Sequence, residues 1–203
     1  MTRGRSKFKD NSSIIRGITT FRPETSSLTR LVSLKLGGIT LYCEDEIILH
    51  RAVNIVREAT KDALKSHLML PRFLIIKFVV EKIGVTIEDR FFGAILGMML
   101  RLGDVTSIPC LTKNNKIRRI YIHSSNISLF GEKLHAVEIL LKKKGELNIA
   151  TVRNICFPDH GWGTWTSSQQ MLQHLAYMGK AVLKDEATFV WPEKVESAIR
   201  PRV

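Results

Sequence analysis

The sequence is poor in cysteine and contains no long hydrophobic run. Its three cysteines, Cys43, Cys110 and Cys156, are odd in number and unevenly spaced, which excludes the disulfide framework of a small secreted protein. The most apolar stretches, residues 73–80 and 91–100, are shorter than the roughly 20 residues that span a bilayer. The N-terminus lacks the apolar segment of a signal peptide. We therefore expect a soluble, intracellular protein without a membrane partner, in the cytoplasm or nucleoid, or in the nucleus of a eukaryote.

The common motifs of enzyme active sites are also missing. There is no glycine-rich phosphate loop ending in Gly-Lys-Ser/Thr, and no Cys-x-x-Cys or His-x-x-x-His pair that could hold a metal. Cys156 and His160 are neighbours, but Pro158 between them disfavours the helical turn that would bring them together. Acidic residues are sparse outside positions 44–46, which leaves little to bind a catalytic metal. We expect a non-enzymatic protein without a cofactor or a metal.

Positive charge, in contrast, is in excess. The 203 residues include 31 Lys and Arg against 19 Asp and Glu, a formal net charge of +12. Hydrophobic content of 44% and charged content of 25% are ordinary for a folded globular protein, so the excess does not come from a disordered composition. Basic side chains release counterions from phosphates, and the charge therefore favours a nucleic-acid partner. Solubility alone, or assembly into an acidic complex, would also explain it.

The first part of the chain divides into an arm, a hairpin and a long helix. Residues 1–27 carry six basic residues against two acidic ones without helical or strand periodicity, which predicts a flexible basic arm. Two strand-like runs within residues 28–42 flank Gly37 and Gly38, a pair suited to a two-residue hairpin turn. The acidic residues 44–46 then precede apolar residues at helical spacing, which predict a long amphipathic helix.

One order of elements then occurs twice. The first copy starts with this long helix and predicts two further helices and a β-hairpin, at residues 72–83, 87–102 and 106–123. Gly84 can end the first of these helices, and Thr86 with Asp89 resembles a capping box for the second. The second copy predicts three helices and a closing hairpin, at residues 132–144, 149–156, 166–178 and 181–191.

The second copy also carries its own helix signals. Gly145 and Gly179 can end helices, Asn148 can cap the short helix, and residues 166–169 form a capping box for the last one. We expect a mainly α-helical protein with small β-hairpins, an α+β fold. The predicted parts are the basic arm, a first domain, a second domain and a C-terminal stub, at residues 1–27, 28–125, 130–192 and 193–203.

In this repeated order the sequence resembles the winged-helix superfamily. The resemblance covers about residues 45–191, and the residues that carry it are 79–86 leading into 90–102 and 106–123, and 148–156 leading into 166–178 and 181–191. It implies two winged-helix modules, each with a recognition helix for the DNA major groove and a hairpin beside it. Most members of the superfamily bind DNA as regulators, replication initiators or transcription-machinery subunits, and a minority only hold other proteins. The long loop at 157–165 and the apolar first recognition helix depart from the pattern.

The first hairpin carries the most basic candidate site. No acidic residue occurs between Asp104 and Glu132, and the hairpin bears four cations and two asparagines that suit a phosphate or groove contact, namely Lys113, Asn114, Asn115, Lys116, Arg118 and Arg119. Ordinary turn and edge-strand charges are the alternative reading. The second hairpin has Asp185 and Glu186 at its tip, and we expect it to avoid a phosphate backbone.

The first recognition helix presents Arg90 and Arg101 on one face, on either side of small residues. This face could approach a phosphate backbone closely, but small residues at this spacing equally suit packing against another helix or a dimer partner.

The second recognition helix presents a more polar face. Its candidate contacts to base edges and phosphates are Gln170, Gln173 and Tyr177, with Thr166, Ser167 and Ser168 at the N-terminus. A solvated helix face is the alternative. Trp162 and Trp165 in the preceding loop fit a protein interface better than base stacking.

The leading hypothesis is a non-enzymatic protein that binds duplex DNA, acting in transcription, replication or chromosome maintenance. An adaptor subunit that holds other proteins in such an assembly, or a homodimer, is the alternative. RNA binding is a third possibility, because charge does not distinguish the two polymers.

Overall fold

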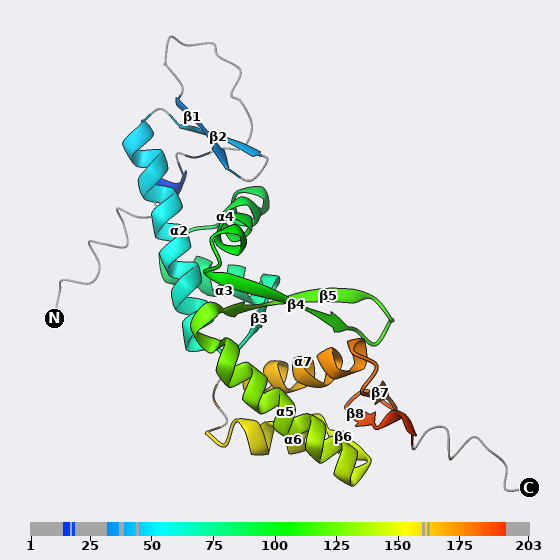
Figure 1. Cartoon of the computed structure of the whole chain (residues 1–203). Helices are drawn as coiled ribbons and strands as arrows, with labels where there is room; N and C mark the ends of the chain where they lie inside the picture. The colour runs from blue at the N-terminus through cyan, green and yellow to red at the C-terminus, as the bar shows by residue number, and fades with distance from the viewer. Residues whose placement is uncertain are drawn as a thin grey trace, which may run out of the picture. The chain divides into compact units, whose positions relative to one another are not determined.

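Helices make up most of the described chain, and three small β-sheets complete it (Figure 1). The structure, a computed structural model, describes residues 14–16, 18, 32–36, 39–43, 45–159, 161 and 163–193. It confirms the predicted α+β class. The chain forms two compact units, one of residues 1–66 and 73–106 and the other of residues 67–72 and 107–203.

The described residues of unit 1 include a hairpin and three long helices. Strands β1 (Val32–Leu36) and β2 (Ile39–Cys43) pair with Leu36 opposite Ile39, which confirms the predicted hairpin. The helices are α2 (Glu46–Ser66), α3 (Arg72–Ile83) and α4 (Asp89–Arg101). Helix α4 contacts α2 and both strands of the hairpin. This packing explains why the sequence of α4 is so apolar, since Phe92 and Ile95 are fully buried.

The long helix α2 follows the predicted pattern. Its buried residues lie three or four positions apart, from Leu49 to Leu64, so one stripe of the helix faces the core. The Asp45 carboxylate accepts hydrogen bonds from the backbone N–H groups of Ile47 and Ile48, at 2.7 and 3.3 Å, and satisfies two donors at the helix N-terminus.

An ion-pair cluster joins α2 to the end of α4. The Arg57 guanidinium donates to the Asp104 carboxylate at 2.7 Å, and the Lys61 ammonium lies 3.4 Å from the same oxygen. All three side chains are mostly buried. The hydrogen bond from Arg57 holds the pKa of Asp104 below its ordinary value, and the charge of Lys61 adds to this.

The described residues of unit 2 form two sheets and include three longer α-helices. The first sheet has the order β3–β5–β4, with β3 at Leu70–Pro71, β4 at Val105–Leu111 and β5 at Ile117–His123; the first two residues of β4 belong to unit 1. A 3₁₀ turn (Ser124–Asn126) leads into α5 (Ile127–Lys144), β6 (Glu146–Asn148), α6 (Ile149–Cys156) and α7 (Thr164–Tyr177). The second sheet has the order β6–β8–β7, with β7 at Val182–Leu183 and β8 at Thr188–Val190.

One hydrophobic core runs through unit 2. It takes Cys110, Ile120 and Ile122 from the first sheet, and its other members include Val137 and Leu141 of α5, Met171, Leu172 and Leu175 of α7, and Phe189 of β8. The hairpin of β4 and β5 therefore packs on the helices that follow it in the sequence. For this reason the boundaries of the compact units differ from the predicted ranges 28–125 and 130–192.

The two halves of the chain share one topology. Each runs helix, strand, helix, helix, strand, strand: α2, β3, α3, α4, β4, β5 and then α5, β6, α6, α7, β7, β8. In each sheet the first strand pairs with the third, and the third pairs with the second. The short strands β3 and β6 were not predicted, because two or three residues show no periodicity.

The sequence predicted the C-terminal ends of α3 and α5 correctly but not the N-terminal ends of α4 and α5. Gly84 and Gly145 end α3 and α5 with φ of 79° and 82°, as predicted. The capping box of Thr86 and Asp89 is wrong, because α4 begins at Asp89 after Glu88, which makes no side-chain cap. Helix α5 begins five residues before the predicted position 132.

The N-terminal arm and the C-terminal stub lie almost wholly outside the described residues. Of residues 1–27, positions 14–16 form a helical turn in which Ile15 is buried. Across the described residues, no helix combines the length and apolar character needed to cross a bilayer.

The Asn148 side chain should stabilise α6 as an N-cap. Its carboxamide oxygen accepts from the Thr151 N–H at 2.7 Å. We expect Asn148→Ala to lower the free energy of unfolding by about 1 kcal/mol. A urea titration followed by tryptophan fluorescence measures this, since all three tryptophans belong to unit 2. Asn154→Ala, at an exposed position within the same helix, is the control, and equal losses in both variants would contradict the cap.

Asp104 should give unit 1 a pH-dependent stability. Its folded pKa is lowered, so its contribution is complete above the unfolded pKa of about 4 and is lost as the pH falls through the folded value. We expect Asp104→Asn to destabilise the protein at pH 7 and to match the wild type in strong acid. Thermal unfolding by circular dichroism across this pH range measures the difference. Asp62→Asn, which breaks an exposed pair with Lys82, is the control and should change stability less. A pH-independent difference for Asp104→Asn would contradict the ion-pair account.

Candidate nucleic-acid interface

The end of the β4–β5 hairpin is built by a tight turn. The Thr112 N–H and hydroxyl both donate to the Lys116 carbonyl at 2.9 Å, and the Thr112 hydroxyl accepts from the Lys116 N–H at 3.2 Å. The Asn115 N–H donates to the Thr112 carbonyl, and Asn115 has a φ of 54°. Asparagine tolerates this left-handed conformation better than most residues, which explains its place here.

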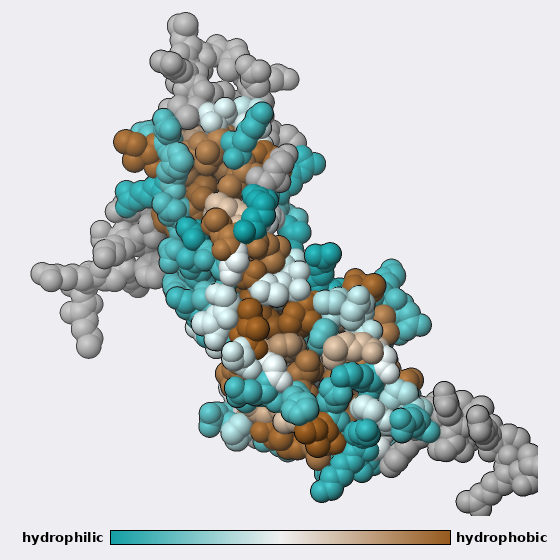
Figure 2. Space-filling view, viewed as in Figure 1, coloured by the Kyte–Doolittle hydropathy of each residue, from teal (hydrophilic) through white to brown (hydrophobic). Residues whose placement is uncertain are grey.

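The four cations at this end of the hairpin, Lys113, Lys116, Arg118 and Arg119, are all exposed; we call them the cationic hairpin end. Figure 2 shows hydrophilic side chains around the end of this hairpin. Lys113 lies 3.9 Å from Glu186, and Arg119 donates to the Ser107 hydroxyl at 3.4 Å. Within the described residues, no carboxylate forms an ion pair with the other three cations.

The burial pattern of β5 shows why the hairpin end is exposed to solvent. Residues 117–119 are exposed, whereas Ile120 and Ile122 are fully buried in the core of unit 2. The strand therefore leaves the core between Arg119 and Ile120. The apolar half of β5 anchors the hairpin, and the basic half extends into solvent.

The tip of the second hairpin is acidic for a structural reason. The Asp185 carboxylate accepts from the N–H groups of Ala187 and Thr188, each at 2.9 Å, and these hydrogen bonds, led by the one from Ala187, lower its pKa. Lys184 donates to Glu146 at 2.8 Å, which raises the Lys184 pKa. Asp185 therefore orders the turn, and its negative charge is retained at neutral pH.

Helix α7 differs most from its predicted role. Its N-terminus is at Thr164 after Gly163, which has a φ of 78°, so residues 166–169 lie inside the helix and form no capping box. Ser167 and Ser168 are buried; their hydroxyls donate to the carbonyls of Met69 and Thr164. The prediction that the backbone N–H groups of these two serines bind a phosphate is wrong, because both residues lie beyond the first three of α7; the Ser167 N–H, for example, donates to the Gly163 carbonyl at 2.9 Å. Thr166 is half-buried.

Strand β4 contacts α7 at residues on or next to the face that was predicted to contact base edges. The Cys110 thiol donates to the Gln170 carbonyl at 3.4 Å, and burial raises the pKa of this thiol to about 12, so it stays protonated. A ring nitrogen of His174 lies 2.7 Å from the Pro109 carbonyl. Gln170 is buried and its side-chain oxygen has no partner, so the prediction that Gln170 contacts bases is wrong.

Two of the predicted contacts on α7 remain accessible. Gln173 is half-buried, and Tyr177 is exposed with its ring stacked on His174, at 6.4 Å between ring centroids. Trp165 is 45% exposed in the first turn of α7, whereas Trp162 lies outside the described residues.

Helix α4 keeps both predicted arginines on its surface. Arg90 and Arg101 are exposed at opposite ends of the helix. The Arg101 guanidinium lies over Gly97, 3.8 Å from the place a β-carbon would occupy there. The opposite face of α4 is buried, so packing within unit 1 accounts for most of the apolar residues of this helix.

The structure also shows a pocket that the sequence did not predict. It has a volume of about 590 Å³ and lies in unit 2, where the hairpin end, α7 and the second hairpin meet. Its polar lining residues are Thr112, Lys113, Asn115 and Gln173. No sequence signal could have found it, because its walls come from three separate segments. Within the described part of the chain, no group of three or more His, Cys, Asp or Glu side chains is placed to hold a metal.

Comparisons with known proteins leave the family of this chain open. No model of a known protein family matches it, and no curated protein is significantly similar. Among solved structures, Methanosarcina barkeri Roco2 RocCORdC bound to GDP aligns at 15% identity with a TM-score of 0.40, over 74% of this chain and 51% of that chain. The chain thus spans about half the length of that structure, and a likeness this low carries no argument about fold or ligand.

Gln170→Met tests whether α7 contacts nucleic acid through its buried face. Methionine has a similar shape and no unpaired oxygen, so we expect the stability to stay the same or rise. We also expect unchanged affinity for duplex DNA in a fluorescence anisotropy titration. Gln169→Met, at a half-buried position next to it, is the control for the substitution itself. A loss of affinity in Gln170→Met alone, with normal stability, would show that Gln170 contributes to DNA binding and would contradict its assignment to the core.

Proposed function

We propose that this protein is a non-enzymatic DNA-binding protein, built from two winged-helix modules, that contacts the phosphate backbone of a duplex through the cationic hairpin end. The observation that carries the proposal is the exposure of four cations on one anchored hairpin, three of them without a carboxylate partner in the described residues. Each phosphate neutralised releases counterions, which is the main source of affinity in such contacts.

The repeated topology supports the winged-helix part of the proposal. Each half places two consecutive helices before a hairpin, and a short strand ahead of them joins the hairpin in one sheet. In that arrangement the hairpin is the wing and the helix before it, α4 or α7, is the recognition helix. The first wing is basic and the second is acidic, so the two modules have different roles.

The packing of α7 changes the expected mode of contact. Because Gln170 is buried and a ring nitrogen of His174 contacts the Pro109 carbonyl of β4, α7 offers few side chains to base edges. Phosphate contacts fix position without reading sequence. We therefore infer weak sequence preference and a strong dependence of affinity on salt.

A protein–protein adaptor is the second candidate function. It is favoured by the same packing, since the polar face of α7 serves the fold of unit 2. Exposed apolar residues, including Ile139 of α5 and Ile155 of α6, would suit a partner surface. Failure to bind DNA or RNA duplexes at about 50 mM salt would favour this function, whereas tighter binding of RNA would change the polymer but keep the interface.

Neutralising the cationic hairpin end should weaken DNA binding and reduce its salt dependence. We expect the triple variant Lys116→Gln, Arg118→Gln, Arg119→Gln to lose about 2.7 from the slope of log affinity against log salt, at about 0.9 per phosphate contact. Fluorescence anisotropy titrations of a labelled duplex at several salt concentrations measure this slope.

The matched control removes three cations elsewhere in the same unit. Lys142→Gln, Lys143→Gln, Lys144→Gln changes the net charge equally at the C-terminal end of α5, where cations interact favourably with the helix dipole. We expect its slope to stay close to that of the wild type. Equal losses in the two triple variants would show that net charge alone, and not the hairpin, causes the binding.

A further inference from the structure

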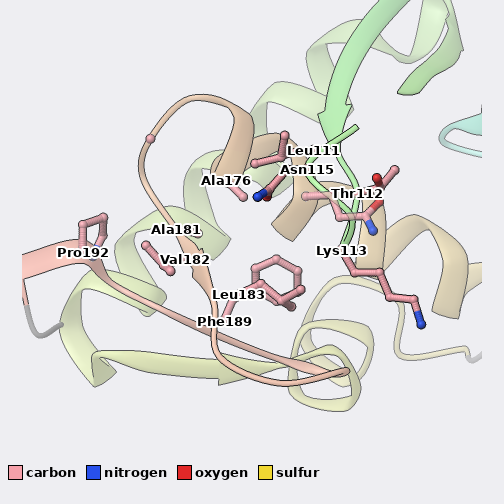
Figure 3. A pocket seen from close by; sticks show the side chains of 12 residues that line it. Leu111, Thr112, Lys113, Asn115, Ala176, Ala181, Val182, Leu183, Phe189 and Pro192 are labelled. Atoms are coloured by element: carbon pink, nitrogen blue, oxygen red, sulfur yellow. The ribbon is translucent and has the colours of Figure 1, made fainter. Parts of the chain in front are cut away.

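The pocket beside the cationic hairpin end has the size of a small-molecule site. Its volume of about 590 Å³ lies within the range of roughly 300 to 1,000 Å³ that such sites occupy. Its lining comes from the hairpin turn, the second half of α7 and the β7–β8 hairpin (Figure 3). All of these segments belong to unit 2, so the pocket is built within one compact body.

One wall of the pocket is apolar and the other is polar. The β7–β8 hairpin and the segment before it supply apolar residues, among them Ala181, Leu183 and the buried ring of Phe189. The hairpin turn and α7 supply Asn115 and Gln173, whose side chains end in carboxamides. An apolar wall accepts the face of a planar ring, and a carboxamide offers both a donor and an acceptor to its edge.

A cation lies at the margin of the same pocket. Lys113 lines it, and in Figure 3 its side chain extends away from the apolar residues. The contact between Lys113 and Glu186 is 3.9 Å long and both side chains are largely exposed, so it contributes little stability. A phosphate group could therefore replace the Glu186 carboxylate as the partner of Lys113.

We propose that this pocket binds a nucleotide, with its base between the apolar wall and the two carboxamides and its phosphate at Lys113. An unpaired nucleotide of the bound DNA and a free nucleotide present the same chemistry. In the first case the inference rests on the proposed function and extends it, because the pocket would take a base that has left the helix while the neighbouring phosphates lie on the cationic hairpin end. In the second case it stands without DNA binding.

The test compares three probes on the full chain. These are adenosine 5′-monophosphate, a DNA duplex with one bulged adenine, and the same duplex fully paired. We expect the bulged duplex to bind about tenfold more tightly than the paired one, the discrimination that a good amide contact to adenine supplies. Calorimetry for the mononucleotide and anisotropy for the duplexes measure the three affinities.

Two neighbouring asparagines provide a matched pair of variants. Asn115 lines the pocket and Asn114 does not, although both are exposed in the same turn. Glycine adopts the positive φ of Asn115 without strain, so Asn115→Gly removes the carboxamide and keeps the turn. We expect Asn115→Gly to abolish the preference for the bulge and Asn114→Gly to retain it.

A third variant should increase affinity, which misfolding cannot mimic. Glu186→Gln releases Lys113 and removes a negative charge from the pocket margin. We expect it to bind the bulged duplex or the mononucleotide a few-fold more tightly, as expected for an exposed ion pair.

The outcomes separate the pocket from the proposed function. Binding of both duplexes with equal affinity, and no binding of the mononucleotide, would overturn the pocket and leave DNA binding by the hairpin intact. Binding of the mononucleotide without either duplex would support the pocket as a free-nucleotide site and overturn the proposed function. Equal effects of Asn114→Gly and Asn115→Gly would overturn the assignment of the base to this pocket.

Discussion

The packing of the β4–β5 hairpin onto α7 is the contact on which the described surface of unit 2 depends. Cys110, Ile120 and Ile122 enter the same core as Met171, Leu172 and Leu175, and burial of such side chains contributes roughly 1.5 to 3 kcal/mol each. This contact fixes the hairpin at its apolar base. It also places the hairpin turn beside the second half of α7, and so creates the pocket.

Because of this contact, one half of strand β5 is buried in the core and the other half carries exposed charges. In β5 the basic residues and the buried isoleucines are consecutive, so the strand changes from solvent to core within one residue. The cations at the free end are exposed, so folding does not remove them from water and they can reach a phosphate. The acidic tip of the second hairpin has a different origin, since Asp185 is needed for its turn.

Local signals in the sequence predicted the elements well, and tertiary packing decided the rest. Gly84, Gly145 and Asn148 act through bonds to residues a few positions away, so their roles could be predicted from spacing. The hairpin turn at 112–116 was recognised for the same reason. The burial of Ser167 and Gln170 could not be predicted from spacing, because Ser167 bonds to Met69, 98 positions away, and Gln170 bonds to Cys110, 60 positions away. An isolated α7 would show a polar face, and only the folded unit, through Met69 and strand β4, buries it.

The first sheet of unit 2 has a proline in each of its outer strands. In the order β3–β5–β4, Pro71 lies in one edge strand and Pro109 in the other. Proline has no N–H to offer to an additional strand, and edge strands that contain it are poor templates for aggregation. Strands β3 and β4 are therefore both poor sites for a strand from another molecule to extend this sheet.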